Sequence, residues 1–167
     1  MTQTTQINIE HVVMTSDRPY EQVIASLEAQ MSTFGKIDEP VAQLATAKAS
    51  WEDIRQTLEK RMGSSGFTIF GKVEQGQLLS LAGRPMRASQ YAIGNPLLAI
   101  QMIEYAPEVA LYAPLRLAVH EDDHGATCIS YDKFTSVVAR YLHPAIAPVA
   151  NTVQQKLEAL VASALGE

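Results

Sequence analysis

The densest group of side chains that could do chemistry is the run His120-Glu121-Asp122-Asp123-His124. A divalent metal site needs three or four such imidazoles and carboxylates to converge at about 2.0–2.2 Å from the ion. The run lies between two apolar segments with strand character, where neighbouring side chains point to opposite faces. We therefore expect a solvated acidic turn here and no metal site.

Arg116, His120 and Tyr131 form a second group, because they lie in the strands expected on either side of this turn, at 115–121 and 126–132. If the turn leaves an even number of loop residues, Arg116 lies opposite Tyr131. All three side chains then share one face. A shift of one residue would separate His120 from Tyr131.

A guanidinium, an imidazole and a phenol on one face can orient a carboxylate or phenolate, with Arg as the strong donor. The pattern predicts a site for an anionic, largely apolar small molecule. The open alternative is an ordinary solvent-facing strand face with an Arg–Glu pair. The predicted ligand-binding residues are Arg116, Tyr131, His120, Tyr112, Tyr91, Asn95 and Glu104.

Residues 96–106 are apolar almost all round, and Asn95-Pro96 in front of them is a strong helix start. We expect this helix to pack between a sheet and another surface, such as a second subunit. Its exposed first amides would favour an anion. Glu104 is its one charged residue. A buried carboxylate must be paired, hydrogen-bonded or protonated, so Glu104 forms a salt bridge, emerges at the helix end, or acts as a pocket acid or base.

Composition excludes several classes of function. The net charge is −5 and no basic stretch is present, which disfavours nucleic-acid binding. Neither a membrane-spanning apolar run nor a secretory signal is visible, so we expect a soluble, cytoplasmic protein. No nucleotide- or hydrolase-type glycine motif occurs, and no cofactor is expected. The lone Cys128 is expected to be a small buried hydrophobe.

The N-terminal half is expected to form a strand at 7–14, with Ile7, Ile9 and Val13 on one face. A helix then presents Tyr20, Val23, Ile24, Leu27 and Met31 at helical spacing. Its expected cap is Ser16 or Asp17, and its expected end is Phe34-Gly35. For residues 38–49 the sequence does not decide whether a short helix forms. Ser50 and Asp53 form a capping-box start for a helix whose inward stripe is Trp51, Ile54, Leu58 and Met62.

Further along, strands are expected at 67–73 and 88–93, with turns at Gly76 and at Gly83-Arg84-Pro85. A final helix is expected from about Pro144 to Leu165. Helices thus interleave with strands, and the hairpin requires antiparallel pairing. We predict an α+β fold over residues 1–167 as a single domain, with helices packed on one sheet and a C-terminal helix.

Four segments, GFTIFGKV, SQYAIGNPLLAIQM, LYAPLRLAVHEDDHG and ISYD, resemble in their order and spacing the domain-of-unknown-function family 302, in its longer members. The resemblance covers nearly the whole chain. It implies helices against a curved, mixed or antiparallel sheet and frequent assembly as a dimer, and it implies no reaction. Shorter members have Phe where this chain has Ile93, and Asp-Leu-Pro where it has Tyr112-Ala113-Pro114, so any role of that Asp is not carried over.

Three functions follow from these observations. The first is a homodimeric module that binds a small, partly apolar, anionic molecule. The second is a cofactor-independent enzyme that uses Glu104, His120 or Tyr131 for proton transfer. The third is a purely structural dimer. A homodimer is expected because residues 97–106, with the VALYAP segment, offer more apolar surface than one sheet needs.

Overall fold

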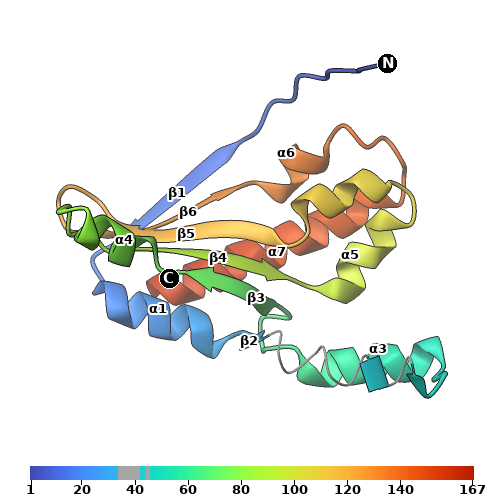
Figure 1. The fold of residues 1–167 in the computed structure, drawn as a ribbon. Coiled ribbons are helices and arrows are strands. Elements are labelled where there is room, and N and C mark those ends of the chain that lie inside the picture. Colours follow the sequence, from blue (N-terminus) through green and yellow to red (C-terminus); the bar gives the residue numbers. More distant parts are fainter. Residues whose placement is uncertain (34–41, 44–45) are drawn as a thin grey trace.

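The computed structural model describes residues 1–33, 42–43 and 46–167, which build one six-stranded sheet with helices packed on it (Figure 1). The strand order is β1-β6-β5-β4-β3-β2, and all neighbours are antiparallel except β2, which runs parallel to β3. The predicted α+β fold with one mixed sheet is therefore confirmed. The strands are β1 His11–Ser16, β2 Ser32–Thr33, β3 Thr68–Val73, β4 Ala88–Gly94, β5 Leu115–Glu121 and β6 Thr127–Asp132.

Helices α1 and α7 lie against each other beneath one face of the sheet (Figure 1). Their apolar stripes meet the inward side chains of β4, β5 and β6 in one continuous core, which includes Leu27, Ile93, Val119, Ile129 and Leu157. The expected C-terminal helix is confirmed as α7. The helices are α1 Tyr20–Ala29, α3 Trp51–Arg61, α4 Gln75–Leu81, α5 Pro96–Ile103, the 3-10 helix η2 Pro107–Tyr112, α6 Phe134–Val138 and α7 Ile146–Leu165.

The β5–β6 hairpin is confirmed, but the register considered from the sequence is wrong by one residue. Leu117 lies opposite Tyr131, and His120 lies opposite Cys128. The reason is an odd loop: the Asp122 amide donates to the Ala126 carbonyl at 2.9 Å, which leaves three residues in the loop. Gly125 closes it with a φ of +82°, a left-handed conformation that glycine adopts without strain.

This register divides the predicted ligand-binding residues between the two faces of the sheet. Tyr131 shares the helix-covered face with Leu117 and is 4% exposed. Arg116 and His120 lie on the opposite face. Cys128 falls on that opposite face as well, where its thiol lies 3.3 Å from the Thr15 hydroxyl and is buried as expected.

The first strand is also shifted from its expected position. It begins at His11, where pairing with Asp132 of β6 starts, and residues 7–10 lie outside it. Val12 and Met14 therefore pack against the core, whereas Ile9 and Val13 are exposed. The pairing of β1 with β6, which is far away in the sequence, determines which face of β1 is buried.

Helix α1 begins at Tyr20 behind Pro19, and neither proposed cap contacts its first turn. Ser16 instead donates its hydroxyl to the Leu165 carbonyl at 3.0 Å, which ties β1 to the end of α7. The buried positions Tyr20, Val23, Ile24, Leu27 and Met31 are as predicted. The helix ends at Ala29, and the expected end at Phe34-Gly35 lies outside the described residues, as does most of the undecided segment 38–49.

Two further details of the middle segment differ from expectation. Gly76 lies inside α4 and not in a turn. A Cβ there would come within 2.4 Å of the Met86 carbonyl oxygen, so the close approach of this backbone requires glycine. Helix α3 starts with the predicted Ser50–Asp53 capping box, but Trp51 is 52% exposed and only Leu58 of its stripe is buried. The spacing alone therefore overstated how much of α3 faces the core.

Candidate functional site

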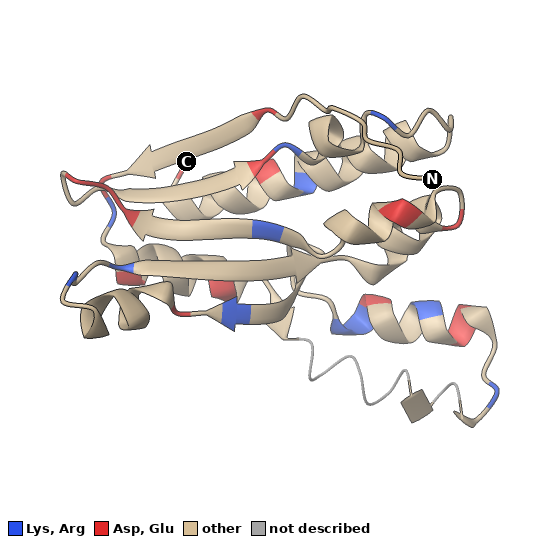
Figure 2. Ribbon diagram, turned by 45° about the horizontal axis from the view of Figure 1, so that its top comes forward, with Lys and Arg blue, Asp and Glu red and all other residues tan. Residues whose placement is uncertain are grey.

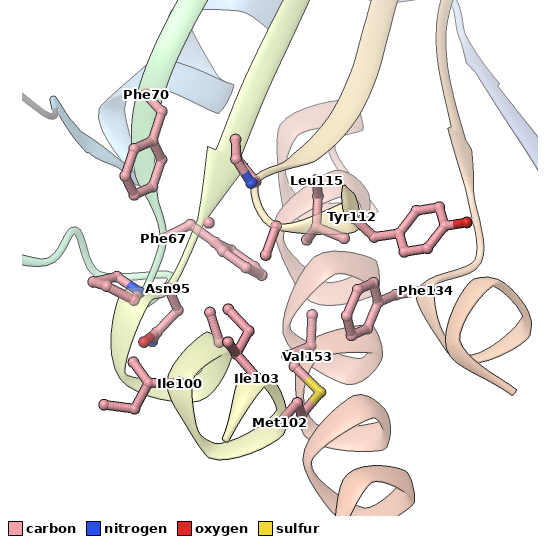
Figure 3. A pocket seen from close by; sticks show the side chains of 15 residues that line it. Phe67, Phe70, Asn95, Ile100, Met102, Ile103, Tyr112, Leu115, Phe134 and Val153 are labelled. Atoms are coloured by element: carbon pink, nitrogen blue, oxygen red, sulfur yellow. The ribbon is translucent and has the colours of Figure 1, made fainter. Parts of the chain in front are cut away.

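A cavity of about 250 Å³ lies where the C-terminal end of β4 meets α5 and η2 (Figure 3). Strand β3, α6 and α7 complete its walls. The side chains that line it are almost all aromatic or aliphatic, and include Phe67, Phe70, Met102, Ile103, Phe134 and Val153. The space is partly open to solvent, so it is an apolar pocket at the edge of the core and not an enclosed void.

Gly94, the last residue of β4, keeps part of this space open. A Cβ at Gly94 would lie 3.2 Å from the edge of the Phe70 ring and 3.6 Å from the Pro114 backbone. An alanine there would therefore press on the Phe70 ring and come into ordinary contact with Pro114, both of which line the cavity. The glycine of the Gly-Asn-Pro sequence thus has a steric role, separate from its neighbours' roles in starting α5.

Asn95 caps α5 as predicted. Its Oδ1 accepts hydrogen bonds from the amides of Leu97 and Leu98, at 3.0 and 3.1 Å. Its Nδ2 donates to the Gly66 carbonyl at 2.9 Å, which anchors the helix start to the turn before β3. The amides expected to attract an anion are therefore already bonded to Asn95. That part of the prediction is wrong.

Helix α5 is not buried all round. Only Met102 is fully buried. Ile100 lines the cavity and is nevertheless 39% exposed, because the cavity is partly open to solvent. Glu104 directly follows the helix and is exposed. Of the alternatives for this carboxylate, emergence at the helix end is the one observed.

The cavity offers almost no free polar group. Its polar lining side chains in the described part of the chain are those of Asn95 and Tyr112, and no charged side chain lines it. The amide of Asn95 is committed to the helix cap. The hydroxyl of Tyr112 points away from the cavity (Figure 3) and accepts a hydrogen bond from Arg140 Nη1 at 2.9 Å. Binding here must rest on shape and apolar contact.

Arg116 lies beside the cavity and not in it. It lines a neighbouring cleft of about 60 Å³, together with Tyr112, Leu115 and Asp132. The Asp132 carboxylate pairs with the His11 ring at 2.8 Å. The structure therefore brings Arg116 close to Tyr112, as predicted, but on the other side of the wall from the cavity.

The remaining predicted residues lie elsewhere. Tyr131 is in the core, and burial raises the pKa of its phenol. His120, on the opposite face of the sheet, lies with Nε2 3.0 Å from the Ser130 hydroxyl. Neither residue lines the cavity, and nor do Tyr91 and Glu104. Of the seven predicted residues, only Asn95 and Tyr112 do.

Tyr91 belongs to a polar network that the sequence did not reveal. Its buried phenol donates to the Glu28 carboxylate at 2.6 Å, and Lys72 Nζ pairs with the same carboxylate at 2.9 Å. Burial, and then the bond to Glu28, raise the pKa of Tyr91. Burial alone would raise the pKa of Glu28, but the bonds from Tyr91 and Lys72 outweigh it and lower that pKa.

The network continues from Lys72 to Glu74 at 2.6 Å, and the hydroxyl of Ser89 links Glu74 to Tyr20. Bonds from Lys72 and Ser89 lower the pKa of Glu74. Every buried side-chain polar atom in the described residues has a hydrogen-bond partner. A Lys and a Glu two apart in an otherwise apolar strand segment, Lys72 and Glu74, were the one available signal for this network.

Charges elsewhere are mixed in sign. Figure 2 shows an acidic turn between β5 and β6 and alternating charges along α3, where Arg55 pairs with Glu52 and Glu59. In the acidic turn Asp122 accepts hydrogen bonds from the amides of His124 and Ala126. Within the described residues there is no group of three or more His, Cys, Asp and Glu side chains that could hold a metal ion, and no helix is long and apolar enough to cross a membrane.

A family model described as domain of unknown function DUF302 matches residues 43–164. The chain belongs to the DUF302 family. The resemblance inferred from its four segments is therefore confirmed. No curated protein matches the sequence.

Among solved structures, the chain is similar to an uncharacterized conserved DUF302 protein from Bacillus stearothermophilus. The TM-score is 0.63 at 18% sequence identity, and the match covers 92% of this chain and 97% of the other. At this level of identity the likeness establishes a shared fold and nothing about a ligand or reaction.

Proposed function

We propose that this DUF302 protein is a binding module that holds a small, largely apolar molecule in the cavity between β4, α5 and η2. The observation that carries the proposal is the cavity itself, about 250 Å³ within walls of aromatic and aliphatic side chains. An apolar cavity of about 150 Å³ in an engineered protein accepts benzene. The space here suits a somewhat larger molecule, with one aromatic ring and a short chain.

The other two functions have less support. Proton transfer by Glu104, His120 or Tyr131 requires at least one of them beside the bound molecule, and none lines the cavity. A purely structural role would not require an empty apolar space, because unfilled volume removes packing contacts and lowers stability. The cavity therefore favours binding.

The test compares two glycine-to-alanine variants. In Gly94→Ala the new methyl group meets Phe70 and Pro114 and reduces the cavity. In Gly71→Ala, on β3, the methyl group meets nothing within 4 Å, which makes this variant the matched control. Toluene is titrated into each protein and followed by chemical-shift changes of the Met102 and Ile103 methyl groups.

We expect the native protein and Gly71→Ala to bind toluene alike, and Gly94→Ala to bind it at least about tenfold more weakly, or 1.4 kcal/mol. Equal binding by both variants, or shift changes confined to residues far from the cavity, would reject this site.

We propose further that the module is a homodimer that associates through the surface of α5 and η2. Large apolar side chains are exposed there: Ile100 is 39%, Tyr105 48% and Leu111 72% exposed. Obligate interfaces are apolar and commonly bury upwards of about 2,000 Å². Light scattering should give twice the chain mass of 18.2 kDa. A monomer mass at every concentration would rule out the dimer, and Leu111→Glu should favour the monomer if this surface is the interface.

A further inference from the structure

Arg140, two residues beyond the end of α6, lies between two tyrosines. Its Nη1 donates a hydrogen bond to the Tyr112 hydroxyl at 2.9 Å, and its Nη2 donates to the Tyr141 hydroxyl. The guanidinium carbon also lies 5.2 Å and 4.5 Å from the centroids of these two rings. Two hydrogen bonds and two ring contacts hold this half-buried cation in one orientation.

The charge of Arg140 is not neutralised by a neighbouring acid. Other basic residues pair with carboxylates, as Arg87 does with Glu21 and Lys133 with Glu10. Within the described residues Arg140 forms no ion pair, and its two acceptors are neutral phenols. A guanidinium has five N–H donors in a fork that matches a carboxylate, so three of them remain for another acceptor.

Tyr112 connects this cation to the cavity. One side of its ring forms part of the cavity wall, while its hydroxyl, at the far end of the ring, is bonded to Arg140 (Figure 3). The fixed cation is therefore one aromatic ring away from the apolar space. Arg116 is also near, but it is exposed and no hydrogen bond fixes its side chain within the described residues.

We propose that Arg140 binds the carboxylate of an amphipathic acid whose apolar part fills the cavity. This inference rests on the proposed function and names its ligand class. The carboxylate replaces the Tyr112 hydroxyl as acceptor. The exchange is favourable because a carboxylate adds the attraction of opposite charges and can accept two parallel N–H bonds from the guanidinium, whereas a phenol oxygen is neutral. The Tyr141 hydroxyl keeps its own proton to donate to the same carboxylate.

The acid reaches Arg140 from the side of Tyr112. On its solvent side Arg140 borders a surface hollow that Glu108 also lines, and this carboxylate repels an anion that approaches from there. No carboxylate lines the cavity itself within the described residues. To reach Arg140 from the cavity, the charged end of the acid must lie along Tyr112, which lines the cavity and bonds the guanidinium.

The test uses two probes of equal shape, 3-phenylpropionate and 3-phenylpropionamide, titrated calorimetrically at neutral pH and low salt. The native protein should bind the acid at least about tenfold more tightly than the amide. Arg140→Gln should remove this preference and leave binding of the amide unchanged, which also shows that the variant is folded. Arg116→Gln, the matched control, should keep the preference. Tyr112→Phe should bind the acid at least as tightly as the native protein, since the competing hydroxyl is gone.

The outcomes separate this inference from the proposed function. Equal binding of acid and amide by the native protein, with both weakened by Gly94→Ala, would overturn the role of Arg140 and keep the cavity as a binding site. Loss of both probes in Arg140→Gln would show a purely structural contact. Loss of the preference in Arg116→Gln alone would assign the charge to Arg116. Failure of the native protein to bind either probe, with toluene still bound, would overturn the proposed acid and keep the cavity as a binding site, whereas failure to bind toluene as well would overturn both proposals.

Discussion

Strand β4 supplies both ends of the covered sheet face, and the two ends are built in opposite ways. Toward its start, Ser89 and Tyr91 enter a closed network with Tyr20, Glu28, Lys72 and Glu74 in which every buried polar atom is bonded. At its end, Gly94 contributes no side chain, and about 250 Å³ of apolar space is left unfilled. One end is fully bonded within the chain, and the other leaves an apolar pocket.

The two ends differ in how completely their side chains are bonded and packed. A satisfied polar network fixes one arrangement of α1 on the sheet, because a partly bonded one would carry a large desolvation cost. An apolar pocket leaves room for additional side-chain atoms, and filling such a space commonly raises the free energy of unfolding. The two regions should therefore respond in opposite directions to substitution.

The largest effect is expected for Tyr91→Ala at the network end. This fully buried side chain fills space beneath α1 and bonds Glu28. Its removal should lower the free energy of unfolding by about 3–5 kcal/mol, the usual cost of truncating a large buried aromatic residue. Urea unfolding of the native protein and of the variant measures this difference in the free energy of unfolding. Tyr91→Phe isolates the hydrogen bond and should cost about 1.5–3 kcal/mol. A loss under 1 kcal/mol in the alanine variant would mean that this end is not rigidly packed.

Asn95→Ala should lower the free energy of unfolding by about 0.5–2 kcal/mol, because both amides bonded to Oδ1 lose their acceptor. Asn95→Asp serves as the control, since its carboxylate still caps α5 but cannot donate to the Gly66 carbonyl. Asn95→Asp should lower the free energy of unfolding by less than Asn95→Ala does. An unchanged melting temperature in Asn95→Ala would contradict the cap.

At the cavity end, Ala99→Leu should stabilise the protein. Ala99 lines the cavity from α5, and a larger side chain there fills the space. Cavity-filling substitutions commonly raise the free energy of unfolding by about 0.5–2 kcal/mol. The same variant should lose toluene binding. A clear loss of stability would show that the space is too small for the added atoms, and would remove the contrast between the two ends.

The network should also make stability depend on acid pH. The pKa values of Glu28 and Glu74 are lowered in the folded protein relative to 4.5. Their stabilising contribution is present above that pH, and it is lost as the pH falls through the lower folded-state values. Glu28→Gln should unfold in urea with a flatter pH profile below pH 5 than the native protein. Asp123→Asn, in an exposed turn, should keep the native profile, and identical profiles for all three would contradict the prediction.

The smallest effect is expected for Glu104→Gln. The side chain is exposed beyond the end of α5 and does not line the cavity. The free energy of unfolding should change by less than about 0.5 kcal/mol. Toluene affinity should stay the same. A marked fall in affinity would revive a role for this carboxylate near the bound molecule.

Features fixed by neighbouring residues could be predicted from the sequence. The Asn95 cap, the Ser50–Asp53 capping box and the strands of the β5–β6 hairpin depend on side chains within a few positions of one another. The stripe from Tyr20 to Met31 follows from helical spacing in the same way. These local patterns, together with the interleaving of helices and strands, were sufficient for the fold class.

Features fixed by residues far apart in the sequence could not be predicted from it. The hairpin register depended on whether Asp122 would pair with Ala126, and the position of β1 depended on β6. The cavity depends in part on the lack of a side chain at Gly94, which faces Phe70 and Pro114. The spacing of residue types in a sequence does not predict where a folded chain leaves space unfilled. Arg140 was not singled out because one of its tyrosines, Tyr112, is 28 positions away.

The pairing of the first strand with the last also sets the order in which the molecule can be completed during synthesis. Thr15 of β1 contacts Cys128 of β6, 113 positions later. Ribosomes add about 5–20 residues per second, so the first strand waits on the order of ten seconds for its partner to be made. During that interval β3, β4 and β5 can pair with their sequence neighbours, while β1 cannot. The first strand can therefore join the sheet only after β6 has been made, later than β3, β4 and β5 can pair with one another.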